Sequence, residues 1–266
     1  MSASETPTDA LRAFYERHPY PPPLRNLDQH RELYRHPDRR RALSLLLWPT
    51  EPQRTNRQIL VAGCGTSQAA IHAMREPDAH VTGIDISETS LCCTRDLQEK
   101  YDLRNLDLHR LAIEDVGVLG QVFDEIVCTG VLHHLPDPDA GLRGLRGVLA
   151  QDGALHVMVY AAYGRAGIYM MQEYCRLLGV RAREAELSDL GAVIGEEPKW
   201  RTRGPFLSLM APKVSSGCLS KGYTRLSDPS RTSSTLCLPG AQTRKRMPSP
   251  SGQAPNVGRQ FIVRYS

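Results

Sequence analysis

The chain has 266 residues, a formal net charge of +4 and 41% hydrophobic residues, values that exclude a collagen-like, wholly disordered or membrane-embedded protein. The net charge conceals a division: residues 1–198 carry 21 lysines and arginines against 28 acids, whereas residues 199–266 carry 12 against one. The seven cysteines are odd in number and irregularly spaced, which is unlike a secreted disulfide framework. Because the amino terminus also lacks the apolar core of a signal peptide, we expect a soluble, cytoplasmic protein.

The amino-terminal segment predicts a short amphipathic helix followed by an extended turn. Residues 8–18 place Leu11, Phe14 and Tyr15 at helical spacing. A run of prolines then ends the helix and displays Tyr20 on an extended path. Tyr15 and Tyr20 are candidates for a lid over a binding site, and the alternative is a helix that packs Phe14 and Tyr15 on the rest of the fold.

Helical patterning resumes over residues 28–47, with an interruption near Pro37. The arginine run 39–41 suggests contact with nucleic acid, but this half of the chain is net acidic. A solvated helix face, or a contact with an acidic neighbour, therefore explains the run better.

From residue 58 the pattern becomes a regular alternation of strand and helix. The predicted strands are residues 58–62, 80–84, 106–111, 123–129 and 154–160, and the predicted helices between them are residues 67–75, 87–101 and 139–149. Strands spaced by helices indicate a parallel sheet with right-handed crossovers and helices on both faces. We predict an α/β fold with a doubly wound, mostly parallel sheet.

A glycine turn and an acid follow the first two strands. The stretch ILVAGCGTSQAA runs from a strand through Gly63, Cys64 and Gly65 into a helix, where glycine permits a tight turn and the close approach of a ligand. Asp85 lies 20 residues beyond Gly65, the distance at which a βαβ unit brings a carboxylate beside such a turn. That carboxylate can accept both hydrogens of a ribose diol, although capping of the next helix would also explain it. Gln68 replaces the third glycine of a dinucleotide fingerprint, which disfavours a pyrophosphate ligand.

Five segments resemble, in order and spacing, motifs of the class I S-adenosylmethionine-dependent methyltransferases: VAGCGTS, GIDIS, LAIEDV, FDEIVCTGVLHHLPDP and GLRGLRGVLAQDGALHVMVY. The resemblance covers residues 59–160. It implies a Rossmann-like methyltransferase fold, S-adenosyl-L-methionine as cofactor, and transfer of a methyl group to an acceptor that the motifs do not name. The segment FYERHPYPPP resembles a lead-in of bacterial members, some of which are joined to tetratricopeptide repeats.

The resemblance also implies which residues hold the cofactor. Gly63, Cys64 and Gly65 would contact its methionine part through the backbone, Asp85 would bind the ribose hydroxyls, and Ile86 would pack on the adenine. The family commonly carries an acid before the first glycine, where this chain has Ala62. This difference implies different contacts to the amino group of the cofactor's methionine part.

Two later motifs complete the implied cofactor site. In LAIEDV the family often places an acid on the adenine amino group, and because Ala112 stands there, the Ile113 backbone and Glu114 are the implied contacts. Cys128, Thr129 and Gly130, just past the fourth strand, would form the floor of the pocket.

The histidines His133 and His134 invite a catalytic or metal role. No Cys, His or carboxylate recurs nearby at ligand spacing, so we predict no metal site. His134 could be a general base near the pocket mouth, and the alternative is a loop histidine that bonds to backbone. Methyl transfer needs alignment more than proton removal, so no catalytic residue is assigned.

Helices are predicted at residues 167–178 and 184–194, after which regularity is lost. Residues 199–266 are rich in serine, proline and glycine and strongly basic, a composition that predicts a disordered tail. Residues 260–265 (QFIVRY) alternate well enough to form a strand. The antiparallel strand pair that completes the sheet in the family cannot be located in this tail.

The sequence therefore divides into a helical, proline-rich lead-in (1–50), a methyltransferase domain (56–198) and the basic tail (199–266). The tail is either an arm for nucleic acid or acidic surfaces or the product of a shifted reading frame. For the whole chain, the alternatives to a methyltransferase are a cofactor-binding protein without catalysis and an NAD-dependent oxidoreductase, which Gln68 disfavours.

Overall fold

The centre of the fold is a seven-stranded sheet with the strand order β3-β2-β1-β4-β5-β7-β6. The structure is a computed structural model that describes residues 6–48, 54–160, 165–179, 241–245 and 258–265. The strands are β1 (Gln58–Ala62), β2 (His80–Asp85), β3 (Leu106–Arg110), β4 (Phe123–Thr129), β5 (Leu149–Tyr160), β6 (Ala241–Lys245) and β7 (Gly258–Tyr265). Strands β1 to β5 pair in parallel, whereas β7 runs antiparallel to both β5 and β6.

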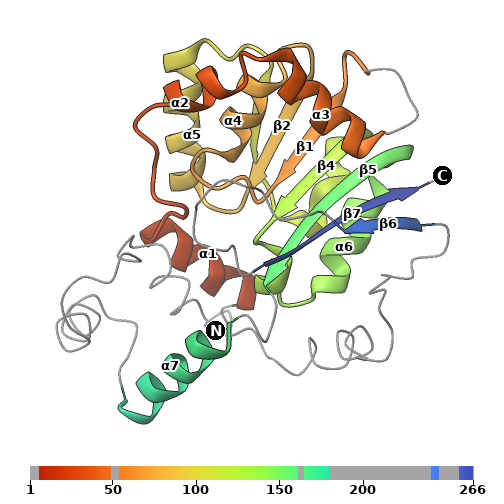
Figure 1. The fold of residues 1–266 in the computed structure, drawn as a ribbon. Helices are drawn as coiled ribbons and strands as arrows, with labels where there is room; N and C mark the ends of the chain where they lie inside the picture. Colours follow the sequence, from red (N-terminus) through yellow and green to blue (C-terminus); the bar gives the residue numbers. More distant parts are fainter. Residues whose placement is uncertain (1–5, 49–53, 161–164, 180–240, 246–257, 266) are drawn as a thin grey trace.

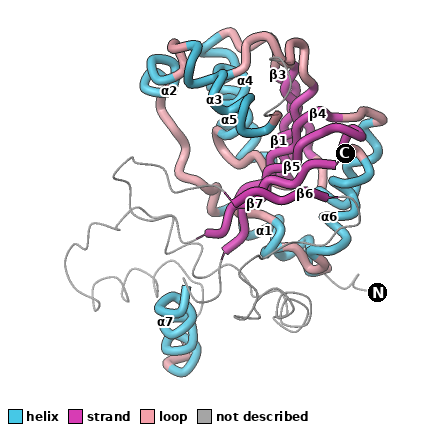
Figure 2. The backbone as a smooth tube through the Cα atoms, turned by 45° about the vertical axis from the view of Figure 1, so that its right-hand side comes forward, coloured by secondary structure: helices cyan, strands magenta, loops and turns pink. Residues whose placement is uncertain are grey.

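Helices cover both faces of this sheet and the ends of its strands (Figure 1). They are α1 (Pro7–Arg17), α2 (Asp28–Leu33), α3 (Pro37–Leu47), α4 (Gln68–Arg75), α5 (Glu88–Tyr101), α6 (Pro138–Gly147) and α7 (Ala166–Leu177), with 3-10 helices η1 (Ile113–Leu119) and η2 (Leu132–His134). Figure 2, which shows the sheet closer to edge-on, places α4 and α5 on one side and α6 on the other, with α7 apart from the sheet.

Alternation along β1 builds two separate cores. Ile59 and Val61 point to one face and pack in the cluster that includes Ala69 of α4. Leu60 and Ala62 point to the other face and pack with the α6 side of the sheet, where Leu145 is fully buried. Successive residues of a strand face opposite sides, so a run of four buried apolar residues requires cover on both faces. This is why β1 lies at the centre of the sheet.

The sequence predicted these elements closely. The predicted strands at 58–62 and 123–129 have the observed bounds, and the predicted break near Pro37 separates α2 from α3. The 3-10 helix η1 was not predicted, and β5 begins at Leu149, several residues before its predicted start. The prediction of a doubly wound, mostly parallel α/β sheet is confirmed.

The carboxy-terminal strands correct one expectation. The antiparallel pair that the sequence did not reveal is present as β6 and β7, with Ala154 of β5 paired to Arg264 of β7. The strand predicted at 260–265 therefore extends over Gly258–Tyr265, and the disorder predicted for the rest of the tail is wrong at Ala241–Lys245, which form β6. The predicted helix 184–194 and the remainder of the 199–266 tail lie outside the described residues.

A buried ion cluster ties the amino-terminal ends of β1 and β4 together. Arg57 donates to Glu125 at 2.5 Å and to Glu76 at 2.6 Å, and Arg75 donates to Glu76 at 3.0 Å. All four side chains are largely buried. The indole of Trp48 lies against the Arg57 guanidinium, 5.4 Å from ring centroid to carbon, so the cluster also holds the end of α3.

Among the described residues, no helix is both long and apolar enough to cross a membrane.

Candidate functional site

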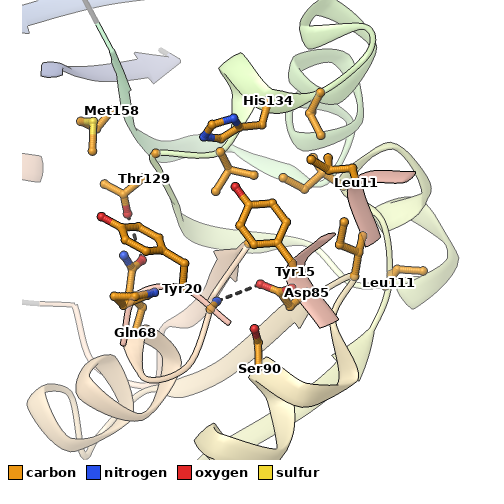
Figure 3. A pocket seen from close by; sticks show the side chains of 18 of the residues that line it. Leu11, Tyr15, Tyr20, Gln68, Asp85, Ser90, Leu111, Thr129, His134 and Met158 are labelled. Carbon is orange, nitrogen blue, oxygen red and sulfur yellow. Dashed lines mark hydrogen bonds between the residues drawn. The ribbon is translucent and has the colours of Figure 1, made fainter. Parts of the chain in front are cut away.

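A cavity of about 260 Å³ lies at the carboxyl ends of β1, β2 and β4, beneath α1. Parallel strands of an α/β sheet present their carboxyl ends to one crevice, which is where such folds bind ligands. Figure 3 shows Asp85 on one side of this cavity, His134 on the other and Tyr15 between them.

The glycine turn after β1 forms one wall of the cavity. Gly63 and Gly65 have φ values of +67° and +56°, which side chains rarely tolerate. A Cβ on Gly63 would lie 2.5 Å from Val131, and a Cβ on Gly65 would lie 2.6 Å from the Tyr20 carbonyl oxygen. The two glycines therefore serve both the turn and the close approach of the elements that surround the cavity.

Asp85 is fixed at the end of β2 by backbone donors. Its Oδ2 accepts from the Gly65 amide at 2.8 Å, and its Oδ1 accepts from the Ser87 amide at 2.9 Å. Burial raises the pKa of Asp85, while these hydrogen bonds act in the opposite direction. Each carboxyl oxygen has further lone pairs, so the group can still accept hydrogens from a ligand.

Most of the residues that the resemblance implied for the cofactor line this cavity. They are Gly63, Gly65, Asp85, Ile86, Ile113, Thr129 and Gly130. The Thr129 hydroxyl donates to Gln68 Oε1 at 3.0 Å, which places both side chains at the same wall.

Three of the implied residues do not line the cavity. Cys64 is fully buried on the α4 side of the sheet, and Cys128 is fully buried on the α6 side. Burial raises the pKa of Cys128 to about 12, so its thiol is inert at neutral pH. Glu114 lies in η1, where its backbone packs against Gly144 of α6. The described lining therefore does not include these three residues, although the contact expected of Cys64 was through its backbone.

The amino-terminal segment covers the cavity. Leu11 and Tyr15 of α1, followed by Tyr20 and Pro21, are among the lining residues. The segment is held down by a hydrogen bond from the Thr66 hydroxyl to the Pro21 carbonyl at 2.7 Å. The two tyrosines that the sequence offered as a lid lie over the pocket.

Glu16 locks α1 onto the first turn of α5. Its carboxylate accepts from the amides of Glu88 and Thr89 at 2.8 and 2.9 Å, and from the Thr89 hydroxyl at 2.7 Å. Partial burial acts to raise the pKa of Glu16, but these hydrogen bonds outweigh it and lower the pKa to about 2. A side chain from α1 thus satisfies the free amides at the start of a helix distant in sequence.

Aromatic rings surround His134 at the far side of the cavity. The His134 ring lies edge-on to Tyr15 and to Tyr160, with centroid distances of 6.3 and 6.1 Å. The guanidinium carbon of Arg165 lies 3.9 Å from the centroid of Tyr160. Burial, followed by the charge of Arg165, lowers the pKa of His134 to about 4, so the ring is neutral at pH 7.

His133 differs from its neighbour. Its ring packs on Tyr160 with a centroid distance of 4.1 Å. Both of its ring nitrogens are buried and have no hydrogen-bond partner among the described residues. Burial lowers its pKa to about 2. In the described part of the chain, no group of three or more His, Cys, Asp or Glu residues could hold a metal ion.

Other lining residues were not identified from sequence. They are Leu11, Pro21, Ser90, Leu111, Val131, Leu135 and Met158. Ser90 lies in the first turn of α5, and Leu111 directly follows β3. Both positions are close to the carboxyl ends of strands, which could have marked them as lining residues. Met158 of β5 carried none, because a buried methionine in a strand usually belongs to the core.

The fold and the pocket together define a Rossmann-like α/β domain with a nucleoside-sized cavity at the carboxyl ends of its parallel strands. Over its whole length the chain resembles the plantazolicin methyltransferase BpumL, solved in complex with SAH: the TM-score is 0.53 at 15% identity, covering 98% of this chain and 96% of that one. That likeness concerns the fold.

The family model described as "Methyltransferase domain" matches residues 60–155. The chain is 41% identical over 148 residues to an uncharacterized protein of Synechococcus sp., covering 55% of this chain. It is 32% identical over 104 residues to the ubiquinone biosynthesis O-methyltransferase of Actinobacillus pleuropneumoniae, covering 37% of this chain. The resemblance to the class I S-adenosylmethionine-dependent methyltransferases is thus confirmed for residues 60–155. The chain spans 35% of the length of the Synechococcus relative and 44% of the Actinobacillus enzyme.

Proposed function

We propose that the chain binds S-adenosyl-L-methionine in the cavity beneath α1 and transfers its methyl group to an acceptor. The observation that carries this proposal is the charge of the lining. Among the described lining residues Asp85 is the one carboxylate, and none is a lysine or arginine. Such a pocket suits a ligand with a ribose, no phosphate and a positive charge. It does not suit the pyrophosphate of a nicotinamide dinucleotide.

The lining residues would then divide the work of binding. Asp85 would accept hydrogen bonds from the ribose hydroxyls, and the half-buried Ile86 would pack on the adenine. Gln68 and Thr129 supply polar groups for the amino-acid end of the cofactor, where Ala62 leaves no acid. The cofactor would supply an electrophilic methyl group on a sulfonium. The chain's own task is to align the acceptor with that group and to exclude water, which α1 does by covering the cavity.

Thermal unfolding with S-adenosylhomocysteine tests cofactor binding. A ligand present at a hundred times its dissociation constant stabilises the folded state by about 2.7 kcal/mol. We expect a clear rise in the unfolding temperature with S-adenosylhomocysteine and none with NAD.

Two arginine substitutions make a matched pair for this measurement. Ile86→Arg fills the cavity beside Asp85 and should abolish the shift, whereas Val118→Arg changes a side chain that is 75% exposed and outside the cavity. The proposal fails if S-adenosylhomocysteine stabilises neither the natural chain nor Val118→Arg. Transfer of label from methyl-labelled S-adenosylmethionine to an acceptor then separates an enzyme from a protein that only binds the cofactor.

A cytoplasmic setting remains part of the proposal. It is supported by the cysteines of the described residues, all five of which are free thiols.

A further inference from the structure

The far side of the cavity has a chemistry that differs from the Asp85 side. We call it the acceptor corner and define it by Tyr15, Tyr20, His134 and Tyr160, all of which line the cavity. Figure 3 shows the rings of Tyr15 and His134 close together on this side. Three of its members are phenols, and one is an imidazole.

His134 is the one member that can accept a proton at neutral pH. Among the described residues, neither of its ring nitrogens makes a hydrogen bond, in contrast to the backbone amide, which donates to Val131. Among the described residues, the titratable and charged groups that face it are Tyr15 of α1, the neighbouring His133, Tyr160 of β5 and Arg165 before α7. None of these four is an acid, so these four groups do not favour the imidazolium.

The charges around the corner also discriminate between acceptors. Among the described lining residues, a protonated amine on this side would meet no carboxylate, because Asp85 is held on the opposite side by the Gly65 and Ser87 amides. Arg165 lies over one face of Tyr160 and adds positive charge beside His134. A cation nearby opposes an ammonium group and stabilises an oxygen that becomes negative.

We propose that His134 takes the proton from the acceptor, and that the acceptor is a flat molecule with a phenolic hydroxyl. This inference rests on the proposed function of the cavity. The aromatic rings of the corner give such an acceptor surfaces on which to pack.

The reaction balances without a further reactant. The acceptor oxygen forms a bond to the methyl carbon as the bond between that carbon and the donor sulfur breaks, and the electron pair of that bond stays with the sulfur. The O–H proton passes to a ring nitrogen of His134, and the resulting imidazolium returns the proton to solvent. Arg165 stabilises the oxygen while its negative charge develops.

The test compares two acceptors on one molecular frame. The probes are 3,4-dihydroxybenzoate and 4-(aminomethyl)benzoate, each supplied with methyl-labelled S-adenosylmethionine. The variants of the full chain are His134→Ala, His134→Gln and, as a matched control, His109→Ala, which changes an exposed histidine of β3 outside the cavity. The shift in unfolding temperature with S-adenosylhomocysteine is measured for every variant.

We expect methylation of the dihydroxybenzoate alone. His134→Ala and His134→Gln should lower kcat by about 10² to 10⁴-fold, the range for removal of a general base. His109→Ala should leave kcat unchanged. Free imidazole should restore activity to His134→Ala at least in part, since it can occupy the space of the missing ring, whereas a merely structural histidine would give no such rescue.

Three results would overturn the inference: preferential methylation of the amine, an unchanged kcat in both His134 variants, or no transfer to the hydroxyl by a chain that binds S-adenosylhomocysteine. In the last case cofactor binding stands and only the acceptor corner is wrong. A natural chain that gives no shift with S-adenosylhomocysteine removes the proposed function itself, and this inference with it.

Discussion

Glu16→Gln tests whether α1 is held over the cavity by the lock on α5. The substitution keeps the size of the side chain but removes the charge that accepts from the amides of Glu88 and Thr89. The carboxylate accepts hydrogen bonds through both of its oxygens, whereas the new amide group has one acceptor oxygen. Its NH₂ group is a donor and would face backbone amides that are also donors. We therefore expect the lock to loosen without a change in packing volume.

The size of the effect follows from the pKa of Glu16. A fall from 4.5 to about 2 corresponds to about 3.4 kcal/mol of preference for the charged form. Because the carboxylate is only half-buried, solvent screening reduces this to about 1.5 kcal/mol. In a chain of this length such a loss lowers the unfolding temperature by about 3 to 6 °C if the whole fold depends on it. If only α1 is released, the same energy weakens S-adenosylhomocysteine binding by about tenfold.

The effect depends on pH in a defined direction. A depressed pKa contributes stability that is fully present above the unfolded value of 4.5 and is lost as the pH falls toward 2. The natural chain and Glu16→Gln should therefore differ at pH 7 and converge between pH 4.5 and 2.

Calorimetric titration with S-adenosylhomocysteine and thermal unfolding are the assays, with amide exchange in α1 to separate local from global loss. Arg17→Gln is the control, since its side chain is exposed and, among the described residues, bonds only to the Ala13 carbonyl within α1. Equal stability, affinity and exchange in Glu16→Gln and the natural chain at pH 7 would refute the reasoning.

Three further predictions follow from the described contacts. Arg57→Met leaves Glu125 buried without its 2.5 Å partner and should lower the free energy of unfolding in urea by about 3 to 5 kcal/mol. The double variant Arg57→Met, Glu125→Leu should largely recover this loss. A double variant that is no more stable than Arg57→Met would contradict the role given to the pair. Gly65→Ala places a Cβ 2.6 Å from the Tyr20 carbonyl oxygen, so it should weaken S-adenosylhomocysteine binding at least tenfold, whereas Gly117→Ala, where a Cβ meets nothing within 4 Å, should bind as the natural chain does. The pKa of His134 is lowered to about 4, so between pH 6.5 and pH 4 the unfolded chain takes up a proton that the folded chain does not. The unfolding free energy should therefore fall by up to about 1.4 kcal/mol per pH unit as the pH is lowered through this range. His134→Gln should flatten this slope, and an equal slope in both chains would contradict the lowered pKa of His134.

Periodicity was sufficient to predict the parallel part of the fold. The buried run in β1 and the helices on either side of it follow from rules that act within about 20 residues. The glycine turn and Asp85 were likewise predictable, because one βαβ unit sets their distance.

Other features of the site and the sheet depend on contacts of longer range or on the face to which a side chain points. Cys64 and Cys128 sit beside lining residues in the chain, but each side chain packs into a core on one face of the sheet. Glu16 meets α5 across 72 residues, and no local pattern signals such a contact. β6 has the sequence AQTRK, which shows no apolar alternation, so its pairing follows from β7 and not from its own propensity.

The position of α1 has a consequence for the order in which the molecule is assembled. α1 is synthesised before every strand of the sheet, yet it covers a cavity whose last described lining residue is Tyr160 of β5. A helix of 11 residues is marginal on its own in water, and the sites that bury Leu11 and Phe14 exist only once the sheet has formed. α1 therefore leaves the ribosome well before the β5 residues beneath it are synthesised, and the cavity that it covers is complete only once β5 is in place.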